Sequence, residues 1–253
     1  MYRRFVAIGD GQTEGVGDGE RRGHRGWADR LAERLAQLTP DLEYANLAVR
    51  GQPCRQVRAE QLDAALRMDP DVATVVAGLN DVVRPGDPDA IAADLDAMIG
   101  ALAGSGARVA TLTYPDIGEI APLARRFRPR LATLNERVRE TAHRHGAVLV
   151  ETDRHPVCAD RRIWSADRLH LNPLGHARLA AGFAQALELP GSDDSWTYPL
   201  PELRAVSLPR FVADELRWAG SFLAPRAWRR LTGRSSGGDR GAKRPQPRPL
   251  LEP

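Results

Sequence analysis

Two kinds of hydrophobic pattern alternate along the chain. Short apolar runs rich in β-branched and aliphatic residues are typical of buried strands, and five of them occur, at residues 5–8, 43–49, 72–77, 108–113 and 147–151. Longer stretches with apolar residues every three or four positions predict helices, at residues 27–38, 57–66, 89–102, 131–145 and 173–187. Strands that alternate with helices predict an α/β fold with a mostly parallel sheet covered on both faces. In such sheets ligands bind beyond the carboxyl ends of the strands.

The pattern changes after the last of these helices. Residues 191–195 are turn-like, residues 211–223 fit one amphipathic helix, and residues 232–253 are rich in glycine, serine, proline and arginine. A stretch of that last composition cannot bury a core, so we expect it to be disordered and without stable contacts to the body. We therefore predict one domain at residues 1–190, a partly helical extension at 191–231 and a disordered basic tail at 232–253.

Positive charge is concentrated towards this tail. The chain has a formal charge of +3, and the residues from Arg226 onward carry eight basic and two acidic side chains, which leaves −3 on residues 1–225. The body therefore lacks the basic surface that nucleic-acid binding needs, and we expect no nucleic-acid partner.

Membrane and metal signals are weak. The chain has no run of about 18 apolar residues, and its first apolar stretch meets Asp10 too soon for a signal peptide. We therefore expect a cytoplasmic protein without a membrane partner. Cys54 and Cys158 are the only cysteines and lack metal-ligand spacing. Two reduced, partly buried thiols are favoured over a disulfide, which the sequence leaves open.

Four short segments, after predicted strands or before the last helix, combine residues used in acyl transfer. Acyl transfer needs a base oriented by an acid, together with hydrogen-bond donors for the developing oxyanion. His170 with Asp167 can supply the base and its acid. Asn80 can offer a side-chain amide and Gly51 an unobstructed backbone N–H. The four segments are Gly9-Asp-Gly-Gln-Thr-Glu-Gly15, Asn46-Leu-Ala-Val-Arg-Gly51, Gly78-Leu-Asn-Asp81 and Asp167-Arg-Leu-His170.

In their order and spacing, these segments resemble the SGNH/GDSL hydrolases, an esterase and lipase-like family, over residues 4–187. The resemblance implies a flavodoxin-like three-layer α/β sandwich whose five-stranded parallel sheet has the strand order 2-1-3-4-5. It also implies a catalytic pair of His170 and Asp167. The oxyanion hole would comprise the backbone N–H groups of Gly11 and Gly51 and the amide of Asn80. A protein of this kind acts on a small-molecule ester or acyl substrate and needs no cofactor and no metal.

One position departs from the family pattern. Where the family reads Gly-Asp-Ser-x-Thr-x-Gly, this chain has Gly11 at the position of the nucleophilic serine. Glycine has no hydroxyl, so no acyl-enzyme can form, and Thr13 belongs to the ordinary pattern rather than replacing the nucleophile. Loss of the nucleophile in a serine protease lowers turnover by a factor on the order of 10⁶. We therefore expect a carboxyl ester hydrolase of SGNH/GDSL type that is inactive or severely impaired.

The origin of Gly11 stays open at this point. The intact remainder of the constellation favours an inactivated variant, whose serine was recently lost or deliberately removed. The alternatives are a natural pseudoenzyme, an ester- or acyl-binding module, or a protein that uses water directly. Acyltransferase chemistry is a further alternative for the parent activity.

Other features of the sequence carry weaker interpretations. Gly9 and Gly11 match the start of the dinucleotide-binding fingerprint, but Glu14 stands where the third glycine is required. The remaining histidines match no motif, and we interpret them as structural or solvated. The arginines at 125, 126, 128 and 130 are interpreted as a solvated loop that could also rim the substrate site. The histidines concerned lie at positions 24, 143, 145, 155 and 176.

Overall fold

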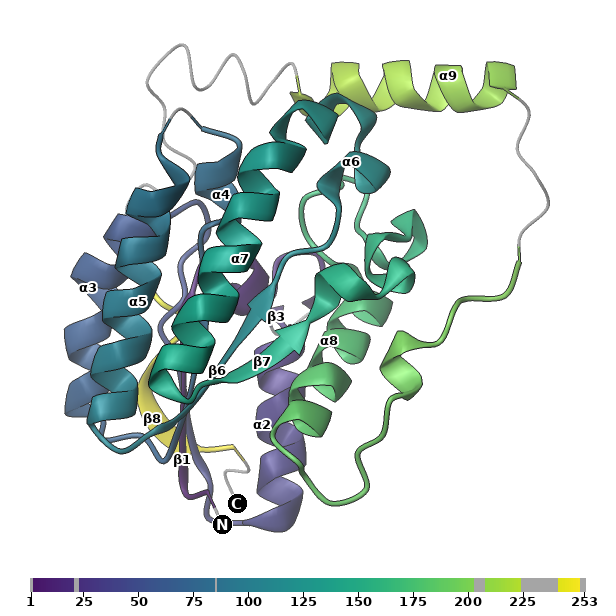
Figure 1. The fold of residues 1–253 in the computed structure, drawn as a ribbon. Helices are drawn as coiled ribbons and strands as arrows, with labels where there is room; N and C mark the ends of the chain where they lie inside the picture. The colour runs from purple at the N-terminus through teal and green to yellow at the C-terminus, as the bar shows by residue number, and fades with distance from the viewer. Residues whose placement is uncertain (1, 21–22, 85, 203–207, 224–240, 251–253) are drawn as a thin grey trace.

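A six-stranded sheet forms the middle layer of the protein in a computed structural model, which describes residues 2–20, 23–84, 86–202, 208–223 and 241–250 (Figure 1). Across the sheet the order is β7-β6-β5-β1-β4-β8, with β8 antiparallel to β4 and all other neighbours parallel. The five parallel strands are the predicted ones in the predicted order, and β8 is an additional edge strand. The bounds are β1 (Arg4–Gly9), β4 (Glu43–Asn46), β5 (Val72–Val76), β6 (Arg108–Thr113), β7 (Val148–Glu151) and β8 (Arg244–Pro249).

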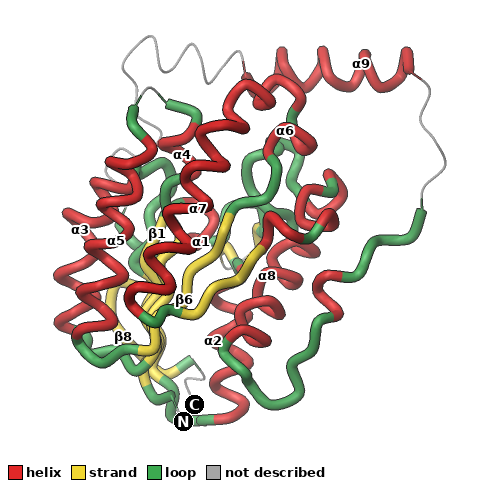
Figure 2. The backbone as a smooth tube through the Cα atoms, viewed as in Figure 1, coloured by secondary structure: helices red, strands yellow, loops and turns green. Residues whose placement is uncertain are grey.

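Helices cover both faces of this sheet, which gives the predicted three-layer α/β sandwich (Figure 1, Figure 2). One layer contains α3 (Cys54–Arg67), α5 (Pro88–Gly104) and α7 (Arg128–His145), and the other contains α2 (Trp27–Leu38) and α8 (Pro173–Ala186). Shorter helices follow the strands, namely α1 (Gly11–Glu14), α4 (Leu79–Val82) and α6 (Ile117–Ile120). The remaining short elements are a hairpin of β2 (Gly19–Glu20) with β3 (Gly23–His24), and 3-10 turns at Pro122–Phe127, Thr152–Arg154, Pro156–Ala159, Arg161–Ile163 and Ser195–Thr197.

The core lies between the sheet and the two helical layers. Every residue of β5 is buried, as are residues 5–8 of β1. A strand covered by helices on both faces buries both of its sides, which explains why these segments are continuous apolar runs rather than alternating ones. Between α2 and α8, Trp27 stacks on Phe183 with ring centroids 4.3 Å apart. Both cysteines are buried and free, as favoured from the sequence.

The C-terminal segment corrects one expectation. Residues 232–253 were expected to lack stable contacts, but β8 pairs with β4, the edge strand of the parallel sheet. Just before β8, the Lys243 ammonium donates to the backbone oxygens of Glu14 (2.6 Å) and His24 (2.9 Å) and pairs with Asp29 (2.5 Å). The expectation of a disordered tail is therefore wrong for residues 241–250. Residues 232–240 and 251–253 lie outside the described part of the chain.

Alternating prolines explain how so proline-rich a segment becomes a strand. In β4, the N–H of Glu43 donates to the carbonyl of Arg3, just before β1, so the next residue, Tyr44, presents its N–H and C=O to β8, where it pairs with Arg248. The backbone N–H and C=O groups of successive residues in a strand point to opposite edges. Because Arg248 is bonded to β4, the backbone groups of the prolines at 245, 247 and 249 point away from β4. Their missing N–H groups therefore cost no ladder hydrogen bond, and they leave the outer edge unable to recruit another strand.

The extension before β8 contains the expected helix with shifted bounds. Helix α9 runs over Leu208–Trp218 and continues as a π-helical turn over Ala219–Leu223, whereas the sequence predicted one helix at 211–223. In Figure 1 α9 lies at the end of the molecule that also carries α4 and α6. Among the described helices, none combines the length and apolar character needed to cross a membrane.

Candidate active site

Gly11 and His170 are in contact at the carboxyl end of β1. Gly11 is the first residue of α1, and a Cβ atom built on it would lie 2.6 Å from Nε2 of His170. The φ angle of Gly11 is not in the left-handed region, so the backbone itself would accept an L-residue. The imidazole therefore occupies space that any side chain at position 11 would need.

Asp167 orients the other side of the His170 ring. Its Oδ2 accepts from His170 Nδ1 at 2.7 Å, while Oδ1 accepts from the N–H groups of Leu169 (2.9 Å) and His170 (3.0 Å) and from the Ser165 hydroxyl (2.6 Å). Burial is the largest influence and acts to raise the pKa of Asp167, but these hydrogen bonds and the His170 charge outweigh it and hold the pKa below its usual value. An ionised carboxylate only accepts, so Nδ1 carries the proton and, in the neutral ring, the Nε2 lone pair faces Gly11.

The backbone between Asp167 and His170 contains one residue in a rare conformation. Arg168 has φ +55°, in the left-handed region that costs a residue with a side chain roughly 1 kcal/mol or more. Such a conformation persists only where surrounding contacts impose it.

Gln12 ties the helix that carries Gly11 to the segment that carries His170. Its Nε2 donates to the Leu169 carbonyl at 3.0 Å, and its Oε1 accepts from the Leu171 N–H at 3.2 Å. The side chain is buried and bridges the backbone on both sides of His170. This contact could not be predicted from the sequence, because nothing in the pattern around Gln12 indicates which distant residues its side chain binds.

The residues expected in the oxyanion hole have been brought to the same edge of the sheet. Asn80, in α4 after β5, donates its amide to Asp10 Oδ2 at 2.8 Å. Gly51 follows β4 with φ +81°, and its carbonyl accepts from Arg84 at 3.2 Å. The preceding residue, Arg50, has its Cβ 3.3 Å from the Cβ position built on Gly11, so this loop lies against the site.

Asp10 is a titratable group that the sequence interpretation did not single out. Burial is the main cause that raises its pKa to about 6, with a smaller contribution from the Asp81 charge. The Gln12 N–H, the His170 charge and the Asn80 amide act in the opposite direction. The candidate site therefore contains a carboxyl group that titrates close to neutral pH.

Two hydroxyl groups, of Thr13 and Ser165, lie near the site. The Thr13 side chain is fully buried, and its Oγ1 lies 2.6 Å from the Cβ position built on Gly9, so it points back at β1. The Ser165 hydroxyl donates to Asp167. The Ser165 hydroxyl is thus engaged by Asp167, and the Thr13 hydroxyl, which has no hydrogen-bond partner among the described residues, points away from His170 Nε2.

Four of the remaining histidines, at positions 24, 145, 155 and 176, and the arginine cluster have structural partners, whereas His143 is exposed. His176 is buried, accepts from the Trp27 N–H at 3.1 Å and contacts the Val16 carbonyl at 3.1 Å, and burial is the main cause that lowers its pKa to about 4. His145 pairs with Asp96. The arginines at 125, 126, 128 and 130 do not form the expected loop, because they belong to a 3-10 turn and the start of α7.

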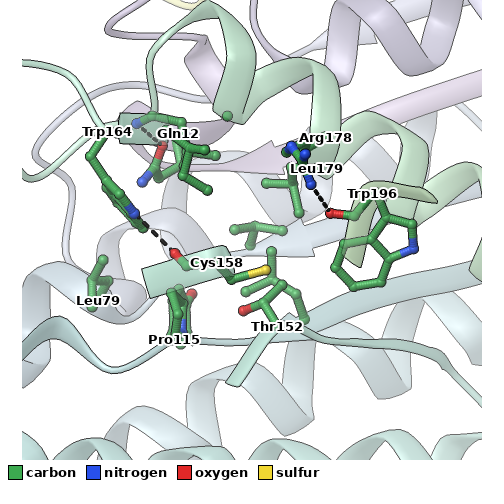
Figure 3. Close-up of a pocket in the computed structure, with 15 residues that line it drawn as sticks. Gln12, Leu79, Pro115, Thr152, Cys158, Trp164, Arg178, Leu179 and Trp196 are labelled. Carbon is green, nitrogen blue, oxygen red and sulfur yellow. Dashed lines mark hydrogen bonds between the residues drawn. The ribbon is translucent and has the colours of Figure 1, made fainter. Parts of the chain in front are cut away.

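A small apolar cavity is lined in part by Gln12 (Figure 3) and by Leu171, the residues that follow Gly11 and His170. Its volume is about 50 Å³, so it is a small cavity. Its walls include Leu79, Leu112, Tyr114, Ile163, Trp164 and Leu179.

Comparison with known proteins places this geometry in a family. No curated protein matches the chain, but solved structures share its fold. The α/β hydrolase LAE5 from the metagenome of Lake Arreo, Spain, aligns with a TM-score of 0.62 and 24% identity over 74% of this chain and 95% of that one. The esterase EstA from Pseudoalteromonas sp. aligns with a TM-score of 0.59 and 16% identity, over 74% and 97% of the two chains. The acetylxylan esterase Axe2 from Geobacillus stearothermophilus aligns with a TM-score of 0.60 and 19% identity, over 78% and 96%.

At these identities the structural likeness establishes the fold alone. The family assignment rests on the sequence match, which covers residues 7–178 and thus more than half of the chain. That span contains Gly11, Asn80, Asp167 and His170. The chain therefore belongs to the GDSL-like lipase/acylhydrolase family.

Proposed function

We propose that this chain binds small carboxylic esters or acyl compounds at the Gly11–His170 site and forms no acyl-enzyme, because Gly11 supplies no hydroxyl. The proposal rests mainly on one observation. His170 Nε2 lies 2.6 Å from the Cβ position of residue 11, and Asp167 holds the opposite ring nitrogen at 2.7 Å. A base that faces the nucleophile position and is oriented by a carboxylate is the arrangement that acyl transfer uses.

The other members of the site have proposed roles around this pair. The N–H groups of Gly11 and Gly51 and the Asn80 amide would receive the carbonyl oxygen of the ester, which gains negative charge in the transition state. Asn80 uses one amide N–H on Asp10, and its second amide N–H is the donor that would receive the ester oxygen. The small apolar cavity beside Gln12 favours esters with short acyl groups.

Without a nucleophile the site keeps only part of its catalytic capacity. In a serine protease, binding and oxyanion stabilisation without the triad retain about 10³–10⁴ over the uncatalysed reaction. We therefore propose an inactivated esterase, which still binds esters but hydrolyses them very slowly or not at all. The position of the His170 ring supports this proposal, because the ring fills the space beside Gly11 that a side chain at position 11 would need.

The variant Gly11→Ser tests the proposal. We expect it to hydrolyse short-chain aryl esters such as phenyl acetate and to be labelled covalently by a serine-directed phosphonate, whereas the unmodified chain is not labelled. His170→Ala in the serine variant should abolish both gains, since the hydroxyl loses its base. A well-folded Gly11→Ser protein that neither labels nor turns over a panel of acyl lengths would contradict the proposal.

A further inference from the structure

Arg168 connects the catalytic segment to the C-terminal extension. It follows Asp167 directly, has φ +55°, and its side chain is only 13% exposed. The guanidinium lies 4.5 Å from the centroid of the Trp218 ring and pairs with Glu215 at 2.7 Å. Glu215 and Trp218 both belong to α9, three residues apart and therefore on one face of that helix.

Two further contacts join the same face of α9 to the same segment. The Trp218 indole N–H donates to the backbone carbonyl of Asp167 at 3.3 Å. Arg161 donates to the second oxygen of Glu215 at 2.6 Å. One carboxylate thus receives two arginines from the segment that ends in the Asp167–His170 pair, and the neighbouring tryptophan contacts Asp167 itself.

These contacts differ from ordinary surface ion pairs. Exposed pairs contribute little, because solvent screens them and two long side chains must be held in one geometry. Here the Glu215 side chain is 19% exposed and Arg168 is packed on an aromatic ring. Removing Glu215 would leave Arg168, with its left-handed backbone, without its carboxylate partner.

We propose that Glu215 and Trp218 are positioning residues, which hold Arg168 in its left-handed conformation and so keep the Asp167 carboxylate in place on His170. The C-terminal extension then supports the active site from outside, by holding the segment that carries Asp167 and His170. This inference rests on the proposed function only for the use of the Asp167–His170 pair, and its test reads the geometry of that pair directly.

The test compares Glu215→Gln with Asp214→Asn in the otherwise unmodified chain. Asp214 is the preceding residue of α9, loses the same charge, and pairs with Arg217 rather than with the Asp167 segment. The first readout is hydrogen exchange of the Leu169 and His170 amides, which both donate to Asp167. The second is the downfield proton resonance of the Nδ1–H that His170 donates to Asp167. We expect Glu215→Gln to speed amide exchange at least tenfold and to broaden the resonance, with neither change in Asp214→Asn.

Arg168→Gly separates positioning from simple attachment of α9. Glycine adopts a positive φ without penalty, so the segment should no longer depend on Glu215. We expect Glu215→Gln to have no added effect on exchange or on the resonance in the Arg168→Gly background. If α9 mattered only through Arg161, Glu215→Gln would loosen the segment in both backgrounds, and the proposal would be wrong.

Other outcomes are equally decisive. Equal exchange in Glu215→Gln and Asp214→Asn would overturn the proposal and leave ester binding untouched. If Glu215→Gln unfolds α9, Trp218→Phe replaces it, because this variant keeps an aromatic ring under Arg168 and deletes the hydrogen bond to Asp167. No change in Trp218→Phe would then overturn the proposal. Loosening by Glu215→Gln together with an unreactive Gly11→Ser would instead contradict the proposed function alone.

Discussion

Asn80 donates one N–H of its side-chain amide to the Asp10 carboxylate over 2.8 Å, so this bond fixes the orientation of a group expected in the oxyanion hole. The two residues follow β1 and β5, which are neighbours in the sheet. Burial is the main cause that raises the pKa of Asp10 to about 6. The hydrogen bond is therefore charge-assisted and strong above that pH, and weaker below it.

The raised pKa of Asp10 predicts a pH dependence of stability. A carboxyl group whose folded pKa lies near 6 and whose unfolded pKa is 3.8 binds more protons in the folded state between these values. Its contribution to the free energy of unfolding is complete below about pH 4 and is lost as the pH rises through 6. We expect urea denaturation to show the unmodified chain losing up to about 3 kcal/mol relative to Asp10→Asn between pH 4 and pH 7.

The exposed Asp63 of α3 provides the control for this measurement. Asp63→Asn should change the free energy of unfolding little across the same pH range. A difference between the unmodified chain and Asp10→Asn that is independent of pH would show that Asp10 does not titrate near 6.

Gln12 is expected to stabilise the junction of Gly11 and His170. Gln12→Leu keeps a similar volume beside the apolar cavity but leaves the Leu169 carbonyl and the Leu171 N–H without their partner. Unpaired buried polar groups cost about 1–3 kcal/mol each, so we expect urea denaturation to show a loss of about 2–6 kcal/mol for the two groups together. Gln56→Leu, which removes only an exposed hydrogen bond to Glu60, should cost less than about 0.5 kcal/mol. Equal losses in both variants would argue against the bridge.

Lys243 and β8 lead to an expectation about the C-terminus. Deletion of residues 241–253 removes the edge strand and the ammonium that binds Glu14, His24 and Asp29. We expect thermal denaturation to show a Tm lower by roughly 5 °C or more, because each 1 kcal/mol shifts the Tm of a domain this size by about 2–4 °C. Lys243→Ala should reproduce part of the loss and the exposed Gln246→Ala almost none. An unchanged Tm after the deletion would show that residues 241–250 do not stabilise the rest of the protein.

Much of the fold follows from patterns that the sequence displays directly. The parallel strands are buried on both faces, so β1 and β5 are continuous apolar runs that can be recognised in the sequence. The strand β8 was missed because its arginines and prolines have the composition of a disordered segment. The period-two spacing of prolines 245, 247 and 249 was the signal of an edge strand.

The site is less predictable than the fold. His170, Asp167 and Asn80 could be named because their chemistry and spacing are distinctive. The contacts that support them, from Gln12 and from Glu215, join residues more than forty positions apart with no periodic pattern. The conformation of Arg168 could not be foreseen either, since arginine has no preference for positive φ and tertiary contacts impose it.

The contact between Gly11 and His170 predicts an energetic coupling between these positions. Gly11→Ala adds the Cβ without a hydroxyl, and His170 must withdraw because its Nε2 lies 2.6 Å from that atom. Overpacking of this kind costs typically about 1–3 kcal/mol, and no backbone penalty adds to it, because φ at Gly11 is not left-handed. His170→Ala removes the obstructing ring, so Gly11→Ala should cost almost nothing in that background. The double-mutant cycle, measured by urea denaturation, should therefore give a coupling of about 1 kcal/mol or more. Additive effects would mean that the ring yields freely to a side chain at position 11, and the Gly11→Ser protein should then keep its full stability.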